Sequence, residues 1–240
     1  MSPTLFHACL FYPVFILIGA QNSFTAVDSG WYRFTFPASA LLLMVYSLVV
    51  LRASNHRQRM LFLVGMLVCA FGENLCVHAL DLYHFAGALA PAYSIPPYVV
   101  LGHGYTIWTA LILSEKSAER FGARRSLSTL WAAIAVVTAA RVLLNRDYPG
   151  IIWLSFFLIP YFLSPRREDK LLLATTYLLA TGLESLGVGI KAWDWHASTY
   201  YYQSARFPLH SPPAAVGGFY ALADWITLQL LRRFNLEAER

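Results

Sequence analysis

Apolar residues along this chain gather into eight long stretches, and short polar segments, most of them basic, separate these stretches. A helix needs roughly 17 to 25 mainly apolar residues to cross the hydrocarbon core of a bilayer. Most of the stretches reach that length, and the first and sixth come close to it. The pattern therefore predicts eight transmembrane helices, at residues 5–20, 34–51, 60–80, 96–114, 127–144, 149–164, 171–191 and 212–231.

Lys and Arg residues alternate between the two sides of these predicted helices. Thirteen lie in the second, fourth and sixth connections and the C-terminal tail, and five lie on the other side. Because short loops rich in Lys and Arg stay in the cytoplasm, we expect a multi-pass protein with both termini cytoplasmic. The longest connection, residues 192–211, is then on the outer side. Its aromatic residues indicate either a cap over a cavity or an interfacial loop.

The composition agrees with an integral membrane protein. Hydrophobic residues make up 58% of the chain and charged residues 13%, compared with about 25% in soluble domains, and the mean hydropathy is +0.50. The net charge of +5 follows from the loop asymmetry, because the basic residues form no single patch, and this argues against nucleic-acid binding. The three cysteines, Cys9, Cys69 and Cys76, lie in apolar stretches, where packing is their expected role.

Two apolar stretches contain a carboxylate, and they resemble each other. The segment GENLCVHALDLYH (72–84) aligns with LESLGVGIKAWDWH (183–196), which pairs Glu73 with Glu184, and each is followed by a Pro-Pro pair. The match predicts two four-helix repeats, residues 1–125 and 126–240. Repeats with an even number of helices have the same topology, so we expect a pseudo-twofold axis along the membrane normal.

Other polar residues are predicted to join the two glutamates. At about 100° per residue in a helix, the polar residues that follow Glu73 lie within an arc of about 140° on its face. We therefore expect a polar pocket in the outer half of the membrane. The residues predicted to line it and bind substrate are Asn74, His78, Asp81, His103, Trp108, Trp195 and Tyr220. Asp224 is either a third pocket carboxylate or a partner of Arg141.

Acid–base chemistry is the function that such a pocket favours. Burial favours the protonated form of a carboxyl group, and a second carboxylate nearby favours it further for one of the two. A protonated acid in an apolar pocket can protonate an alkene, and its conjugate base can then remove a proton or activate water. The alternative is that Glu73 and Glu184 only join helices through Asn74, Ser185 or a Tyr hydroxyl. Asp81 and Lys191 lie close to the outer interface, where solvated side chains are common.

A metal site is the less favoured interpretation of the histidines. His78, His84, His103, His196 and His210 lie toward the outer side with several carboxylates. No HxxxH or HExxH spacing is present, so we expect neither a metal nor another cofactor.

The pattern E…Y-H…I-P-P…L-G-H-G in the first half, with E…G…W-D-W…P-L in the second, resembles the integral membrane carotenoid-biosynthesis family. That family includes hydratases that add water to the terminal double bond of acyclic carotenoids. The resemblance covers residues 70–110 and 182–225 and implies a cofactor-free isoprenoid enzyme in which Glu73 and Glu184 are catalytic. A segment that reads Gly-Val-Pro-Leu in the family reads SIPPY here, so the specific reaction stays open. Small integral membrane terpene cyclases are similar in chemistry rather than in sequence.

Three classes of function stay open at this point. The favoured one is an enzyme that hydrates, cyclises or isomerises a lipophilic, isoprenoid or carotenoid-like substrate within the membrane lipid, with Glu73, Glu184 and Asp224 as catalytic residues. A small transporter or channel with a midplane polar site is the alternative, for which GVG (187–189) and GG (217–218) are the candidate helix breaks. A scaffold subunit is the third, and the oligomeric state is open in each case.

Overall fold

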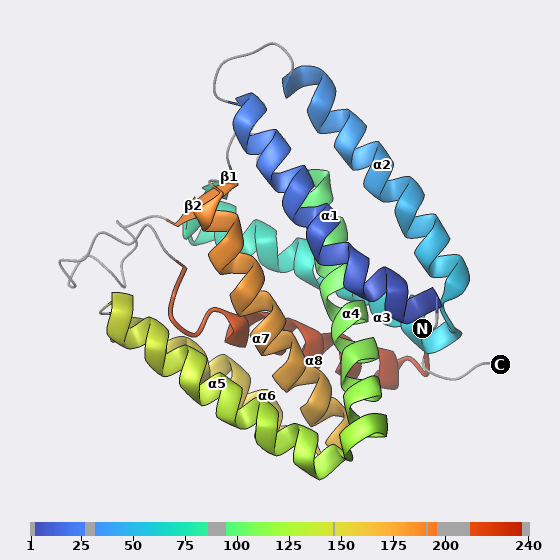
Figure 1. Cartoon of the computed structure of the whole chain (residues 1–240), viewed down its shortest axis with the longest axis vertical. Coiled ribbons are helices and arrows are strands. Elements are labelled where there is room, and N and C mark those ends of the chain that lie inside the picture. The colour runs from blue at the N-terminus through green and yellow to red at the C-terminus, as the bar shows by residue number, and fades with distance from the viewer. Residues whose placement is uncertain are drawn as a thin grey trace.

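The structure, a computed structural model, describes residues 3–26, 32–85, 95–145, 147–190, 192–195 and 212–236. Within these residues it contains eight α-helices (Figure 1). They are α1 (Pro3–Ala26), α2 (Tyr32–Ala53), α3 (His56–Asn74), α4 (Pro97–Phe121), α5 (Ala123–Asn145), α6 (Ser155–Leu163), α7 (Arg167–Gly189) and α8 (Gly217–Arg233). A π-helical turn, η1 (Leu75–Ala79), extends α3, and a 3-10 helix, η3 (Pro149–Leu154), leads into α6.

Each of the eight predicted stretches overlaps one of these helices, and within the described residues two short strands depart from the all-α prediction. Strands β1 (Tyr83–Phe85) and β2 (Trp193–Trp195) form a small antiparallel ladder, in which Tyr83 is opposite Trp195 and Phe85 is opposite Trp193. Each strand has only three residues and follows a long helix, so neither leaves a period-2 pattern long enough to recognise in the sequence.

Among the residues that the structure describes, three helices are long and apolar enough to cross a membrane: His56–Ala79, Ala123–Leu144 and Arg167–Gly189. Two shorter apolar helices cover Ala40–Ala53 and Gly150–Leu163. Large apolar side chains stand on the outside of the molecule, and Phe71, Leu144 and Phe162 are 74%, 82% and 70% exposed. An exposed apolar surface of this kind is typical of a membrane protein.

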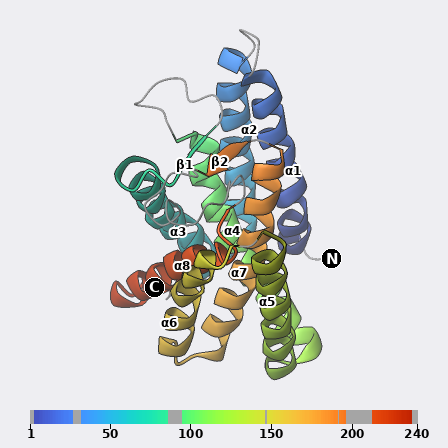
Figure 2. The same ribbon diagram turned by 90° about the vertical axis from the view of Figure 1, so that its left-hand side faces the viewer.

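Helices α3, α4, α7 and α8 form the core. Helix α3 packs against α4 and α8, and α7 packs against the same two helices. Outside this core, α1 and α2 lie against α4, α5 lies against α4 and α7, and α6 lies against α7 and α8. Figure 2 shows α3 and α8 on the same side of α4 and α7 and inclined to them. The β1–β2 ladder lies near the C-terminal ends of α3 and α7 (Figure 1).

Local sequence signals fix the ends of the helices that form the site. Helix α3 begins with a capping box, in which the side chain of Asn55 accepts the Gln58 N–H and the Gln58 side chain accepts the Asn55 N–H. Pro96 precedes α4 and Pro97 occupies its first turn, where a missing N–H costs nothing. At the second Pro-Pro pair, turns over residues 214–216 precede α8, which starts at Gly217 rather than at the predicted residue 212.

Candidate functional site

Glu73 lies at the C-terminal end of α3 and is 5% exposed. Its two carboxylate oxygens have different partners. Tyr83, on β1, donates its hydroxyl proton to Oε2 at 2.5 Å. His103, on α4, is hydrogen-bonded through Nε2 to Oε1. One proton can therefore be shared between the imidazole and the carboxylate, while the tyrosine stabilises the charge left on the acid.

Glu184 lies on α7, is also 5% exposed, and accepts hydrogen bonds from three side chains. The indole N–H groups of Trp193 and Trp195 lie 2.9 and 3.2 Å from Oε2, and the Tyr220 hydroxyl lies 2.5 Å from Oε1. An indole N–H can only donate, so at least two of the three partners require an acceptor oxygen. The three donors replace part of the water that burial removes and so lower the cost of a charge on Glu184.

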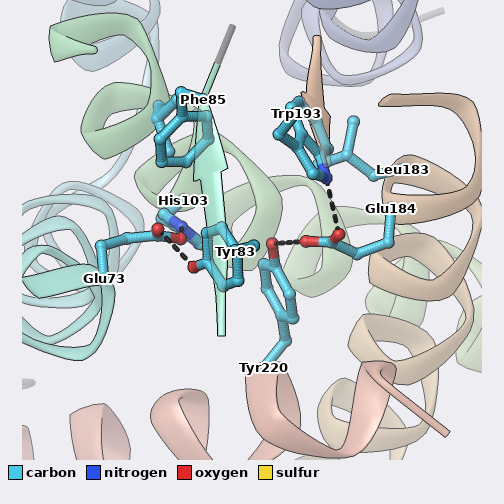
Figure 3. A pocket seen from close by; sticks show the side chains of 10 residues that line it. Glu73, Tyr83, Phe85, His103, Leu183, Glu184, Trp193 and Tyr220 are labelled. Carbon is cyan, nitrogen blue, oxygen red and sulfur yellow. Dashed lines mark hydrogen bonds and ion pairs between the residues drawn. The ribbon is translucent and has the colours of Figure 1, made fainter. Parts of the chain in front are cut away.

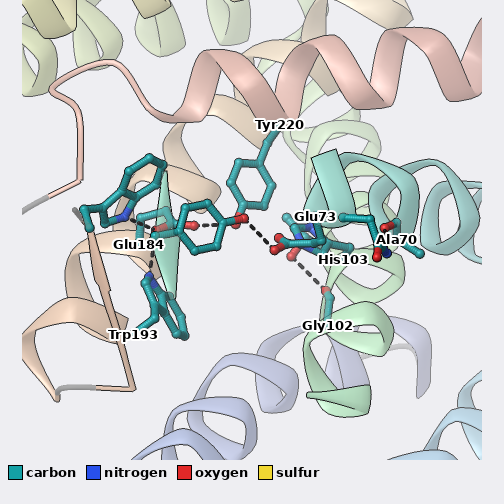
Figure 4. A network of polar contacts seen from close by, with 11 residues as sticks. Ala70, Glu73, Gly102, His103, Glu184, Trp193 and Tyr220 are labelled. Atoms are coloured by element: carbon teal, nitrogen blue, oxygen red, sulfur yellow. Dashed lines mark hydrogen bonds and ion pairs between the residues drawn. The ribbon is translucent and has the colours of Figure 1, made fainter. Parts of the chain in front are cut away.

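The two glutamates face each other across one small enclosed space. Figure 3 shows Glu73 and Glu184 approaching from opposite sides, with the rings of Tyr83 and Tyr220 between them. The cavity that they line has a volume of about 20 Å³, enough for about one water molecule. The two clusters are also joined through aromatic rings, because the His103 and Tyr220 ring centroids are 4.9 Å apart. Figure 4 shows the resulting row of polar groups from Glu184 to Glu73.

A much larger apolar groove reaches the Glu73 side of this cluster. It has a volume of about 540 Å³ and lies between α3 and α8, with Glu73, His103 and Tyr220 at its polar end. Its other lining residues are Val64, Leu67, Val68, Cys69, Phe71, Gly72, Leu75, Phe219, Leu222, Ala223, Ile226 and Leu230. Leu67 and Phe71 are strongly exposed, so the groove opens at the surface of the molecule.

The strands explain how each glutamate obtains its donors. Residues two apart on a strand point to the same face, so Trp193 and Trp195 both turn toward Glu184. Trp193 fits there only because residue 187 is glycine: a Cβ on Gly187 would lie 1.9 Å from the Trp193 ring. On β1 the two corresponding residues are Tyr83 and Phe85, and the Phe85 side chain has no hydrogen-bond donor. Glu73 therefore accepts one hydrogen bond from its strand, whereas Glu184 accepts two.

Five of the predicted site residues meet at this cluster: Glu73, Glu184, His103, Tyr220 and Trp195. Asp224 is buried on α8, where it accepts the Thr176 hydroxyl at 2.5 Å and lines neither the cavity nor the groove. The alternative that Asp224 pairs with Arg141 is wrong. The Arg141 guanidinium donates to the Ser185 hydroxyl and, at 2.8 Å, to the Pro212 carbonyl.

The expected placement of Trp108 in the pocket is also wrong. Its indole N–H donates to the Ser54 hydroxyl at 2.9 Å, at the end of α2. Trp108 is five residues beyond His103 on the same helix, which rotates it by about 140° and moves it about 7.5 Å along the axis. It therefore belongs to the packing of α4 against α2.

The prediction that Asn74, His78 and Asp81 share the inward face with Glu73 is corrected as well. All three side chains are exposed, and the Asn74 amide donates to the Ala70 carbonyl of its own helix. Asn74, about 100° around the helix from Glu73, already lies outside the buried face of α3. His78 lies in the π-helical turn η1, and Asp81 has a φ of 49°, so a constant 100° per residue does not hold past Asn74.

Several predicted groups fall outside the described residues or side chains. Lys191, His196 and His210 lie outside them, and for His84 only the backbone pairing in β1 is described. Within the described residues, no group of three or more His, Cys, Asp or Glu side chains could hold a metal ion.

Tyr83 and Trp193 are the important residues that the sequence argument missed. Both donate to a site glutamate from a strand. The signal was present in the repeated spacing of two residues, Tyr83 with Phe85 and Trp193 with Trp195, after each glutamate-containing helix. Cys69 was assigned to packing, and it lies in the wall of the groove one helical turn before Glu73.

Comparisons of the chain with family models, with curated protein sequences and with solved structures found no match. The resemblance to the carotenoid-biosynthesis family therefore stays an expectation from the sequence.

Proposed function

We propose that this protein is an integral membrane enzyme that performs cofactor-free acid–base chemistry on a double bond of a lipophilic, isoprenoid-like substrate. The observation that carries the proposal is the apolar groove between α3 and α8, which ends at the buried Glu73–His103 pair. A pocket of a few hundred Å³ that is apolar except for a few convergent polar groups is typical of a small-molecule site.

The shape of the groove supports a chain-like substrate. Its lining residues run from Val64 on α3 to Leu75 at the start of η1, and from Phe219 to Leu230 on α8. Eleven residues of helix rise about 16 Å, which accommodates several isoprene units laid along the helices. Because the groove opens beside exposed Leu67 and Phe71, a hydrophobic chain reaches it directly from the lipid.

The hydrogen bonds suggest different roles for the two acids. Glu73 shares a proton with His103 at the end of the groove, so this pair is the proton donor and acceptor. Glu184 is held as an acceptor by two indoles and a phenol, so its charge stabilises a positive charge that forms nearby. The faces of Tyr220 and Tyr83 between the acids add cation–π stabilisation of a carbocation.

A balanced reaction follows from this division. The Glu73–His103 pair gives a proton to one carbon of the double bond, and the other carbon becomes a cation. In isomerisation the pair then removes a proton from a neighbouring carbon. In hydration a water molecule forms the new C–O bond, and the proton that it loses restores the pair. A cavity of about 20 Å³ beside Glu73 can hold the one water molecule that hydration needs.

Membrane topology is part of the proposal. Eight helices, exposed apolar surface and the distribution of Lys and Arg support a multi-pass protein with both termini in the cytoplasm.

The two glutamates have matching partners, which supports the two-repeat origin. Each glutamate is bonded to an aromatic residue of the strand that follows it and to a residue of the next core helix. The glycines proposed as transporter breaks lie at the end of α7 and the start of α8 rather than inside a helix, so the enzyme is favoured over the transporter.

The decisive experiment is to express the protein in a host that supplies acyclic isoprenoids and to compare lipid extracts by mass spectrometry. We expect the wild-type protein to produce either a product heavier by one water or an isomer of unchanged mass. Glu73→Gln should abolish this product, because an amide cannot exchange a proton with His103. Glu184→Gln should reduce it strongly, since the amide removes the charge that stabilises the cation.

Glu119→Gln is the matched control, because Glu119 is an exposed carboxylate at the other end of α4 and should have no effect on the product. Tyr83→Phe keeps both acids and removes only one donor to Glu73, so a folded variant with partial activity is expected. Lipid extracts that are identical with and without the wild-type protein would refute the proposal.

A further inference from the structure

A second cleft lies away from the glutamate site, between the N-terminal part of α5, the end of α6 and the start of α7. It has a volume of about 460 Å³. Its α5 wall contains Arg124, Leu127, Ser128 and Trp131, whose i, i+3, i+4, i+7 spacing places them on one helix face. Tyr161 of α6 and Arg167 of α7 complete the lining.

The charge in this cleft is uncompensated. Arg124 and Arg167 are exposed, and within the described part of the chain neither guanidinium has a hydrogen bond or ion pair. None of the described residues that line the cleft is a carboxylate, and Glu168, which follows Arg167, lines a different hollow between α4 and α7. Asp169, in the same first turn of α7 as Arg167, is already bound by Arg232 at 2.6 Å. Lys170 adds a third cation, 5.1 Å from the Tyr161 ring centroid. The cleft therefore attracts an anion.

Next to the cations, the cleft is lined by aromatic rings, and exposed aliphatic side chains lie beside it. The Trp131 and Tyr161 rings meet edge to face, with centroids 5.0 Å apart. On both sides of Tyr161 in α6, large apolar side chains such as Ile159 and Phe162 are exposed. Cations, aromatic rings and exposed apolar surface are the three features that contact the headgroups, the interface and the acyl chains of a membrane.

We propose that this cleft binds an anionic phospholipid. Its phosphodiester lies between Arg124 and Arg167, and its acyl chains run down the apolar surface between α5 and α6. Arginine suits this task because its planar donors match phosphate oxygens. The position agrees with the basic, cytoplasmic side of the molecule, where anionic lipids collect. The proposal does not depend on the function of the glutamate site.

The experiment measures thermal unfolding of the purified full chain in a neutral detergent as lipid is added. We expect phosphatidylglycerol to raise the melting temperature and phosphatidylcholine or inorganic phosphate to leave it unchanged. Arg124→Gln/Arg167→Gln should raise the phosphatidylglycerol concentration needed for half the effect by roughly 25-fold, because each cation contributes about fivefold. High salt should weaken the effect.

Arg52→Gln serves as the matched control, because Arg52 is an exposed arginine at the end of α2, away from the cleft. It should keep the full response to phosphatidylglycerol. Both substituted arginines are exposed, so the double variant should fold like the wild type without lipid. An equal response of the double variant and the wild type would overturn the proposal, as would a stabilisation by inorganic phosphate as large as that by the lipid.

Discussion

Each glutamate can be buried in an apolar core because hydrogen-bond donors from several side chains replace the water that its carboxylate loses. An isolated carboxylate in hydrocarbon costs many kcal/mol, and the cost falls only when hydrogen bonds replace hydration. Glu184 has three such donors, and two of them come from indoles that could only donate. Glu73 has a tyrosine and a histidine, and the histidine can also take a proton. The two acids therefore differ in proton transfer: Glu73 has a partner that can accept a proton, and Glu184 has two partners that can only donate hydrogen bonds.

Gly187 makes the Glu184 site possible, and this gives a prediction at the residue scale. In Gly187→Ala the new methyl group would overlap the Trp193 ring. We expect the variant to lose about 1–3 kcal/mol of stability through overpacking. We also expect a loss of activity, because Trp193 can no longer donate to Glu184. Denaturant unfolding and the lipid assay measure the two effects.

Gly182→Ala is the control for this substitution. Gly182 lies on the same helix, and its Cβ would have no neighbour within 4 Å. Alanine there should stabilise α7 by up to about 1 kcal/mol, because glycine is the weaker helix former. If Gly187→Ala were as stable and active as Gly182→Ala, the packing of Trp193 against α7 would be wrong.

At the scale of elements, the groove between α3 and α8 leads to a second prediction. Ala223 lines the groove on α8 and is partly exposed. In Ala223→Trp the indole should occupy part of the 540 Å³ and block the substrate while leaving Glu73 and His103 in place. We expect product formation to fall at least tenfold, with a melting temperature close to that of the wild type.

Ala132→Trp is the control that tests whether a tryptophan at any exposed position lowers product formation. Ala132 is exposed on α5, far along the chain from the groove. Full activity in Ala132→Trp with loss in Ala223→Trp would support the groove as the substrate path. Normal turnover in a folded Ala223→Trp protein would exclude it.

The elements also show where sequence reasoning reached its limit. The glutamate helices and the Pro-Pro start of α4 could be predicted, because apolar length and proline position act locally. The ladder of β1 and β2 could not, since each strand is three residues long and pairs with a partner 110 residues away. Tyr83 and Trp193 were therefore missed although both were visible in the sequence.

At the scale of the whole molecule, orientation in the membrane is the property to test. We expect a fluorescent protein fused after Arg233 to fluoresce, because the C-terminus is predicted to be cytoplasmic. A phosphatase that folds only outside the cytoplasm should be active when fused after Asp147, in the connection between α5 and α6. The control exchanges the two reporters between these sites, so that each site carries the other reporter. An active phosphatase at Arg233 would contradict the proposed topology.

The sequence by itself indicated a membrane protein and determined the approximate positions of the eight helices. Long apolar stretches with basic connections have few other solutions, because an apolar helix is stable in lipid without help from its neighbours. It also indicated Glu73 and Glu184, since a carboxylate in such a stretch requires partners.

Only the tertiary structure decided which residues are those partners. Asn74 is adjacent to Glu73 in sequence yet exposed, whereas His103, thirty residues away, contacts its carboxylate. The reason is geometric: one face of α3 meets α4 and α8, and a rotation of 100° is enough to leave that face. The groove, the small cavity and the cleft at Arg124 likewise depend on how helices distant in sequence pack together, which no local pattern encodes.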